Sequence, residues 1–231
     1  MKEYSVCLES VPWDTFRCKK AANSLDIDVK KKLRHDFSVT ADIEADFNVG
    51  MMVGASGSGK STLAESIYGA EALERVLQLD KPIIEQFPEA YTYDDCARML
   101  CGVGLSAVPC WIRPAGTLSN GQRERAEIAL QMSLEKDQVV IDEWTSVVDR
   151  TVGKVMSECI QKWARKTGKR VILISCHYDV LDWLQPDWVI DCNKQEYLDR
   201  RGSKKNEGRN WNSASGKSVV SHGNTLANIT I

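Results

Sequence analysis

The chain has 231 residues, of which 43 % are apolar and 27 % charged, and its 32 acidic and 30 basic residues give a net charge of −2. These proportions are ordinary for a globular protein and exclude a chain that is disordered throughout. A charge so close to zero argues against a protein that coats nucleic acid over its whole surface. The length is enough for one domain or two small ones.

The sequence shows no feature of export or membrane insertion. Its first residues carry charges and a proline where a signal peptide needs an apolar run. The longest uncharged stretch of apolar character, residues 99–112, is shorter than the roughly 20 apolar residues of a spanning helix. Eight cysteines form no C-x-x-C pair and no histidine lies near a cysteine cluster. We therefore expect a cytoplasmic protein with free, mostly buried thiols and neither a zinc site nor a disulfide framework.

Taken in chain order, the predicted elements begin with an alternating segment, Phe37–Ile43, which is typical of an antiparallel strand with one wet face. Short apolar runs follow, separated by segments long enough for helices, such as residues 150–166. These runs suit strands buried on both faces and are Val49–Val53, Val139–Ile141, Val171–Ile174 and Trp188–Ile190. The alternation predicts an α/β fold with a mainly parallel sheet, preceded by an N-terminal antiparallel β subdomain.

A glycine-rich loop follows the first of these runs and matches the P-loop pattern G-x-x-x-x-G-K-[ST]. Its glycines let backbone N–H groups turn towards phosphate oxygens, and a helix that starts near its lysine points its positive end at the same anion. We expect Lys60 to lie between the β- and γ-phosphates and Ser61 to bind Mg²⁺. The ATP-binding residues expected here are Gly54, Ser56, Gly57, Ser58, Gly59, Lys60, Ser61 and Thr62.

A second Gly-Lys-Ser, at residues 216–218, is not a P-loop. The first glycine of the pattern would fall at residue 211, which is Trp211, and no buried strand precedes it.

Two acidic residues end the run Val139–Ile141, at the sheet edge where open α/β sheets bind ligands. Asp142 can hold Mg²⁺ through water, and Glu143 can polarise an attacking water. The alternative is that the pair only caps a strand, and the presence of the P-loop favours the functional interpretation.

Leu118–Gln122 reads Leu-Ser-Asn-Gly-Gln at the start of a helical pattern, and here the sequence resembles the ATP-binding cassette (ABC) ATPases, whose signature is LSGGQ. The resemblance continues in the family's order over roughly residues 1–195. Gln86 falls where the Q-loop glutamine belongs, Ser146–Asp149 resembles the D-loop, and His177 resembles the switch histidine.

The resemblance implies a P-loop NTPase core with a short α-helical subdomain at about 87–130, within an ATPase domain spanning 1–199. It implies an ATP-dependent homodimer in which each P-loop and its ATP face the partner's signature residues Ser119, Gly121 and Gln122, with Asp149 nearby. Catalysis would rest on Glu143, His177 and Lys60. The Mg²⁺ ligands would be Ser61, Gln86 and Asp142.

Two departures from the family pattern stand out. Asn120 replaces the first signature glycine, which places a side chain beside the γ-phosphate. The aromatic residue that stacks on adenine is not obvious: we name Phe16, with Trp13 and Phe37 as the other candidates, because the basic insert 19–34 blurs the register.

Three hypotheses remain for the process that ATP hydrolysis drives. The segment 87–117 has 31 residues and is shorter than the corresponding segment of transporter members. Sequence segments such as Lys81–Pro88 resemble those of soluble bacterial and phage ABC-type ATPases, some of which are fused to a GNAT-type acetyltransferase domain. We therefore expect a soluble ATPase that drives or gates a separate effector protein. The alternatives are the ATP-binding subunit of an ABC transporter and a nucleotide-sensing module that hardly hydrolyses ATP.

The tail, residues 200–231, differs in charge from the rest of the chain. It carries six basic residues and one acidic residue, a net charge of +5, which leaves −7 for residues 1–199. We expect a flexible or loosely docked tail, with DNA binding as its functional alternative.

Overall fold

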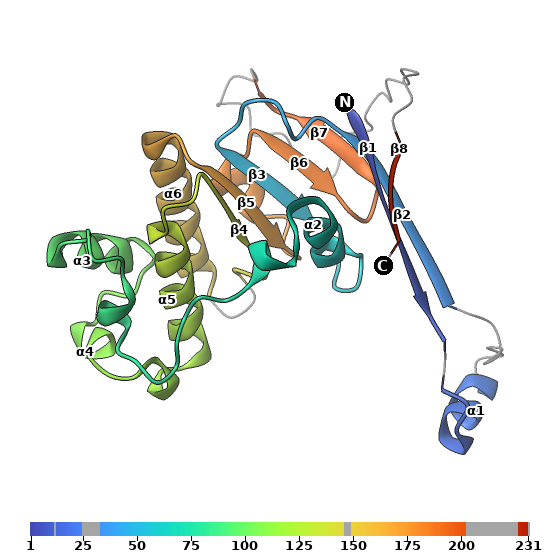
Figure 1. Ribbon diagram of the computed structural model, residues 1–231, viewed down its shortest axis with the longest axis horizontal. Coiled ribbons are helices and arrows are strands. Elements are labelled where there is room, and N and C mark those ends of the chain that lie inside the picture. The colour runs from blue at the N-terminus through green and yellow to red at the C-terminus, as the bar shows by residue number, and fades with distance from the viewer. Residues whose placement is uncertain (12, 25–32, 146–148, 202–225, 231) are drawn as a thin grey trace.

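The computed structural model describes residues 1–11, 13–24, 33–145, 149–201 and 226–230, and the statements below concern these residues. A five-stranded sheet forms the centre (Figure 1), in the order β4-β5-β3-β6-β7. All neighbours in it are parallel except β6 and β7, which are antiparallel. Its strands are β3 (Val49–Val53), β4 (Gln138–Ile141), β5 (Arg170–Ser175), β6 (Trp188–Asp191) and β7 (Glu196–Asp199). The expected mainly parallel sheet is confirmed.

Helices and a second sheet cover the two faces of this central sheet. Val49, Met51 and Val53 of β3 pack in one core cluster with α5 (Asn120–Ser133) and α6 (Arg150–Thr167). Met52 belongs to the opposite cluster, with α2 (Lys60–Tyr68) and the N-terminal strands. A strand that is buried on both faces needs apolar side chains at every position, so it forms a continuous apolar run. Such a run can be recognised in the sequence alone.

The second sheet has the order β2-β1-β8. Strands β1 (Lys2–Ser10) and β2 (Leu33–Ala41) are antiparallel, and Phe37 and Val39 are buried whereas Ser38 and Thr40 are exposed, as the alternation predicts. Strand β8 (Leu226–Thr230) runs parallel to β1. This strand lies in the tail that was expected to be flexible or loosely docked, and no pattern in the sequence predicts it. The rest of the expected flexible tail, 202–225 and 231, lies outside the described residues.

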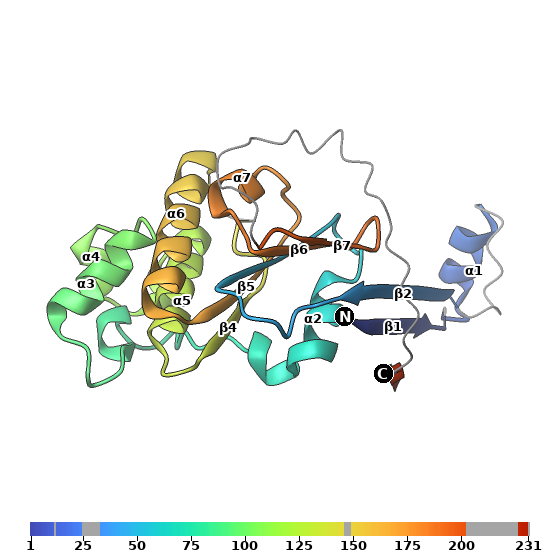
Figure 2. The same cartoon turned by 90° about the horizontal axis from the view of Figure 1, so that it is seen from above.

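The β1–β2 pair extends beyond the body of the molecule and carries the helix α1 (Phe16–Asn23) at its far end, as both views show (Figures 1 and 2). We call β1, α1 and β2 together the arm. Its register runs without a break from Lys2 opposite Ala41 to Ser10 opposite Leu33, which accounts for its length.

The expected helical subdomain is present as α3 (Tyr93–Gly102) and α4 (Val108–Trp111), followed by α5. A short 3₁₀ turn, Ala115–Thr117, lies between α4 and α5, and two more, Ala70–Leu73 and Ile83–Gln86, precede α3. The indole Nε1 of Trp111 donates to the Leu105 carbonyl oxygen at 2.7 Å, so the buried ring also fixes the turn between α3 and α4.

The tryptophan at the start of β6 is fully buried. A Cβ added at Gly50, on the neighbouring strand, would lie 2.1 Å from the Trp188 ring, so this position accepts only glycine. The ring packs edge-on against Phe47 with centroids 5.4 Å apart. Trp188 thus forms a packed entry to the strand. The remaining short helix, α7 (Val180–Leu184), packs on α6.

None of the helices in the described part of the chain is both long enough and apolar enough to cross a bilayer. None of the eight cysteines, all of which lie in the described part of the chain, forms a disulfide. Only Cys96, Cys110 and Cys192 are buried, so the expectation of mostly buried thiols is met only in part.

Candidate functional site

The P-loop joins the carboxyl end of β3 to the start of α2. Gly57 and Gly59 take positive φ angles of 80° and 84°, a backbone region that favours glycine. Gly59 is also the N-cap of α2 and supplies no side-chain cap, so the first N–H groups of this helix are available to an anion. Lys60 is only 7 % exposed, and its Nζ donates to the carbonyl oxygens of Gly54 at 2.8 Å and Ala55 at 2.7 Å.

The loop fits a phosphate chain on two further observations. A Cβ built at Gly57 or Gly59 would meet nothing within 4 Å, so no other atom of the described residues fills the space beside either glycine. The Ser58 hydroxyl is buried and, within the described part of the chain, has no hydrogen-bond partner. A buried hydroxyl without a partner costs about 1–3 kcal/mol, and a phosphate oxygen would satisfy it.

A polar network from the far end of the chain positions the loop. Asn193, which follows β6, accepts the Ala55 N–H through Oδ1 at 3.0 Å and donates from Nδ2 to the Tyr178 hydroxyl at 3.1 Å. Tyr178 donates in turn to the buried carboxylate of Asp191 at 2.9 Å. Burial and this bond to Asp191 raise the pKa of Tyr178 to about 12, so the phenol keeps its proton at neutral pH. The network ties the P-loop to the residue next to His177.

Asp142 and Glu143 follow β4 directly, as predicted. Asp142 is half-buried and accepts the Glu143 N–H through Oδ1 at 2.8 Å. Glu143 is exposed and has a φ of +50°, a conformation that costs a non-glycine residue of the order of 1–3 kcal/mol. Strain of this kind gathers at functional sites, which supports a role in chemistry over a simple strand cap.

His177 lies after β5 and is held by two hydroxyl groups. The Thr145 Oγ1 lies 3.0 Å from His177 Nδ1 and 2.7 Å from the Ser175 Oγ, and Ser175 Oγ also accepts the His177 N–H at 3.0 Å. Thr145 and Ser175 are 4 % and 1 % exposed. With Nδ1 engaged by the threonine, Nε2 is the ring nitrogen that is left for a ligand.

The Leu-Ser-Asn-Gly-Gln motif starts α5 through a capping box. Ser119 Oγ accepts the Gln122 N–H at 3.3 Å, and Gln122 Oε1 accepts the Ser119 N–H at 3.1 Å. Asn120 accepts a hydrogen bond from the Arg123 guanidinium. Arg125 donates to the Gly121 and Gly104 carbonyl oxygens at 3.0 and 2.8 Å, which ties the motif to the end of α3. The exposed Ser119 therefore stands at the positive end of a rigid helix.

The expected D-loop is described only at its last residue. Asp149 caps α6 by accepting the Val152 N–H at 3.0 Å, whereas residues 146–148 lie outside the described residues.

Gln86 is not directed at the P-loop in this structure. Its Oε1 accepts the Gln78 N–H at 2.7 Å, and its Nε2 donates to the carbonyl oxygens of Gln78, Lys81 and Pro82 at 2.9, 3.1 and 3.3 Å. The side-chain amide thus holds its own loop together. Its expected role as a magnesium ligand stays a prediction and requires these bonds to be exchanged.

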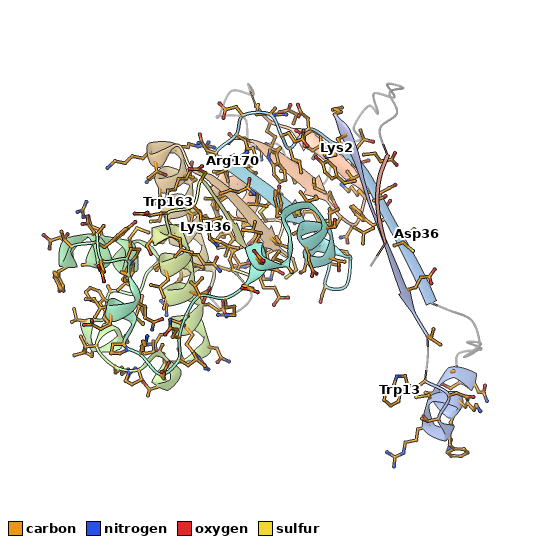
Figure 3. The ribbon with its side chains drawn as sticks, viewed as in Figure 1. Lys2, Trp13, Asp36, Lys136, Trp163 and Arg170 are labelled. Atoms are coloured by element: carbon orange, nitrogen blue, oxygen red, sulfur yellow. The ribbon has the colours of Figure 1, made fainter. Side chains whose placement is uncertain are left out.

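The structure does not place Phe16 where an adenine-stacking residue belongs. Phe16 lies on α1 at the end of the arm and is 81 % exposed; Trp13 beside it is 78 % exposed (Figure 3). Phe37 is buried in the core instead. The continuous pairing of β1 with β2 carries residues 13–16 away from the loop before α2 (Figure 1), and the sequence gives no sign of this pairing length.

Three residues important to the site were not foreseen: Thr145, Ser175 and Asn193. Each acts through a contact with a residue distant in sequence, such as Asn193 with Ala55, 138 positions apart. No local pattern in the sequence marks them, although Asn193 does follow the last buried apolar run.

Taken together, the fold and the loop have the form found in P-loop nucleotide-binding proteins. No protein-family model matches the chain. An energy-coupling factor transporter ATP-binding protein of Leuconostoc mesenteroides, EcfA1, is 26 % identical over 217 residues, covering 76 % of this chain and 80 % of that protein. An ABC transporter ATP-binding protein of Listeria monocytogenes, whose description is marked as putative, is 29 % identical over 190 residues, covering 63 % of this chain and 70 % of that protein.

Solved structures share the fold. The bacterial ABC transporter cassette MJ0796, solved as a dimer, matches with a TM-score of 0.52 at 17 % identity, over 73 % of this chain and 93 % of the other. A dimeric post-hydrolysis state of the same cassette, bound to ADP and Pi, matches with a TM-score of 0.55 at 16 % identity and the same coverage. The chain therefore has the fold of an ABC ATPase cassette. The likeness to the group fused to an acetyltransferase domain is not shown.

Proposed function

We propose that the protein binds Mg-ATP at the P-loop, pairs with a second copy around two ATP molecules, and hydrolyses them. The open P-loop with its uncapped helix end and its partnerless Ser58 hydroxyl carries this proposal. Lys60 would exchange the carbonyl oxygens of its own loop for β- and γ-phosphate oxygens. Ser61 and Asp142 would hold Mg²⁺, which neutralises phosphate charge when it is bound.

The residues at the carboxyl edge of the sheet would have different roles in hydrolysis. Glu143 would orient the attacking water and accept its proton, since its strained backbone sets the carboxylate at the strand end. The Nε2 of His177 would donate to the γ-phosphate, while Thr145 holds the ring through Nδ1.

The second copy is needed because the chain supplies half of the site. Helix α5 packs in the core cluster on one face of the central sheet, and α2 packs in the cluster on the other. The Ser119 that starts α5 would therefore close over the γ-phosphate held by another chain. A Ser119 hydroxyl and the N–H groups behind it suit that anion.

This proposal predicts a turnover rate that rises faster than linearly with protein concentration. Glu143→Gln should bind ATP, lose turnover and sediment as a dimer with Mg-ATP, whereas ADP should leave it monomeric. Glu143→Gln with Ser119→Arg is the matched control, because it keeps the P-loop and blocks closure. A Glu143→Gln protein that stays monomeric at saturating ATP would contradict the proposal.

We propose a membrane transporter component as the partner that ATP hydrolysis drives. The relatives named above are transporter ATP-binding proteins, and they support this alternative better than the soluble effector favoured by the sequence. The soluble effector stays a second candidate because the segment 87–117 is short, with the 10-residue α3 and the 4-residue α4 as its α-helices.

A pull-down of ATP-loaded Glu143→Gln from detergent-solubilised membranes and from the soluble fraction separates these two candidates. A polytopic membrane protein in the first supports the transporter subunit, and a partner in the second alone supports the soluble effector. DNA binding by the tail is tested in parallel by fluorescence anisotropy at rising salt, since contacts with phosphates weaken steeply with salt.

A further inference from the structure

The end of the arm exposes large apolar side chains far from the two cores. Val11, Trp13 and Phe16 are 63 %, 78 % and 81 % exposed, and Figure 3 shows Trp13 lying outside the body of the molecule. Helix α1 also exposes Arg17 and Lys20. Aromatic residues together with arginine are typical of the centre of a protein interface, whereas single exposed apolar residues need no partner.

The arm points to the side on which the ATP-bound second copy would lie. Figure 1 shows α1 beyond the edge towards which the arrows of β5 and β6 point, and that carboxyl edge carries the P-loop. In the proposed dimer this edge faces the partner's Ser119. An element that projects past the P-loop therefore reaches the partner's surface around the start of α5.

That surface holds a cavity of about 380 Å³. Leu77 and Leu79 give it apolar walls, and Leu79 is 51 % exposed. Its other lining residues are Arg75, Asn120, Arg123 and Glu124. The buried carboxylate of Glu127 fixes one wall by accepting the N–H groups of Val76 and Leu77 at 2.8 and 2.9 Å. A preformed cavity with apolar walls and arginines suits an aromatic side chain.

Charge complementarity points to the same pairing. Residues 13–24 carry three basic residues and one acidic residue, a net charge of +2. Residues 80–95, which continue from the cavity wall, carry five acidic residues and one basic residue, a net charge of −4, and Asp80, Glu85, Glu89 and Asp94 are exposed. Opposite charges of this size would speed the encounter and fix its orientation.

We propose that, in the ATP-bound dimer, the end of each arm docks on the second copy, with Trp13 and Phe16 against the cavity beside Asn120 and the basic face of α1 against the acidic segment 80–95. The inference rests on the proposed dimer. Single-stranded nucleic acid, which also binds exposed aromatic and basic residues, is the less favoured occupant. Outside residues 13–34, residues 1–199 carry 17 basic and 28 acidic residues, and that surface repels phosphates.

The test uses the full chain with Glu143→Gln and Mg-ATP, and measures the dimer dissociation constant by sedimentation velocity. Trp13→Ala with Phe16→Ala, and separately Leu79→Ala, should each weaken the dimer, the arm pair by about tenfold or more. The variant with all three changes should lose less dimerisation free energy than the sum of the two separate losses, because the two surfaces contact each other. Val155→Ala, at a half-exposed site on α6, is the matched control and should change nothing.

Hydrogen exchange gives a second readout that does not depend on a substitution. The backbone of residues 13–24 should gain protection when ATP forms the dimer, and not with ADP. A dimer of unchanged affinity in the arm variants, with no protection of residues 13–24, overturns the docking and leaves the dimer intact. Protection that follows added single-stranded DNA instead of ATP also overturns it. No dimer in any variant overturns the proposed function itself.

Discussion

The two halves of the proposed ATP site are built in different ways. The P-loop half is held by bonds between residues far apart in the chain: Ala55 with Asn193, and His177 with Thr145. In the signature half, the capping contacts join residues three positions apart, Ser119 with Gln122 and Asn120 with Arg123, and one bond from Arg125 reaches the end of α3 in the same subdomain. The first half therefore depends on the whole sheet, whereas the second is a local cap presented by the helical subdomain.

This difference indicates which half-site should respond to substitutions elsewhere in the chain and which should respond only to substitutions within it. A distant substitution can displace the P-loop or His177, since each depends on a polar contact with a residue beyond another strand end. A substitution in the signature helix should act on the partner's ATP and leave the binding of a first ATP to the same chain unaffected.

The largest expected effect separates the two halves directly. Lys60→Ala should weaken ATP binding by the isolated chain by about 100-fold or more, because a buried charge-assisted contact with phosphate is lost. Ser119→Ala should leave that binding unchanged and lower turnover instead. Equilibrium binding of a fluorescent ATP analogue at low protein concentration, and ATPase assays at high concentration, measure the two. Equal losses of affinity in both variants would remove the distinction between the halves.

The next effect concerns the support of His177. Thr145→Val removes the hydroxyl on Nδ1 and keeps the shape of the side chain, so kcat should fall by about tenfold while KM stays within a factor of about two. Thr145→Ser should restore most of the rate because it returns the hydroxyl. Steady-state kinetics of the three proteins provide the measurement. A parallel loss of rate in the valine and serine variants would mean that packing of the methyl group, rather than the hydrogen bond, holds the site.

Much of this architecture could be predicted from the sequence, and the exceptions have physical reasons. The apolar runs that became β3 to β6 are buried on both faces, and the P-loop is contained in the consecutive residues 54–62. Both signals are local. The position of Phe16 depends on how far β1 and β2 stay paired, and that of Gln86 on carbonyl oxygens of its own loop. Such features are set by tertiary context, so local patterns did not reveal them.

A smaller effect tests the support that Asn193 gives to the P-loop. Asn193→Ala removes the acceptor for the Ala55 N–H, at a turn outside the phosphate contacts themselves. The ATP dissociation constant should rise by about five- to tenfold, equal to one neutral hydrogen bond, with little change in kcat at saturating ATP. Asn193→Asp is the matched variant: it keeps the acceptor oxygen but adds a negative charge beside the carboxylate of Asp191. A loss of kcat without a loss of affinity would place Asn193 in the chemistry instead of the loop.

The smallest effect lies in the signature cap, where Asn120 stands in place of the family's glycine. Asn120→Gly removes the contact with Arg123 and the side chain next to Ser119, but the capping box of Ser119 and Gln122 survives. The change in unfolding free energy should stay below about 1 kcal/mol, since exposed contacts of this kind contribute little. Turnover should change by no more than about threefold, and Asn120→Ala should behave alike if only the Arg123 contact matters. A faster glycine variant beside an unchanged alanine variant would instead show that backbone freedom at this position limits closure of the dimer.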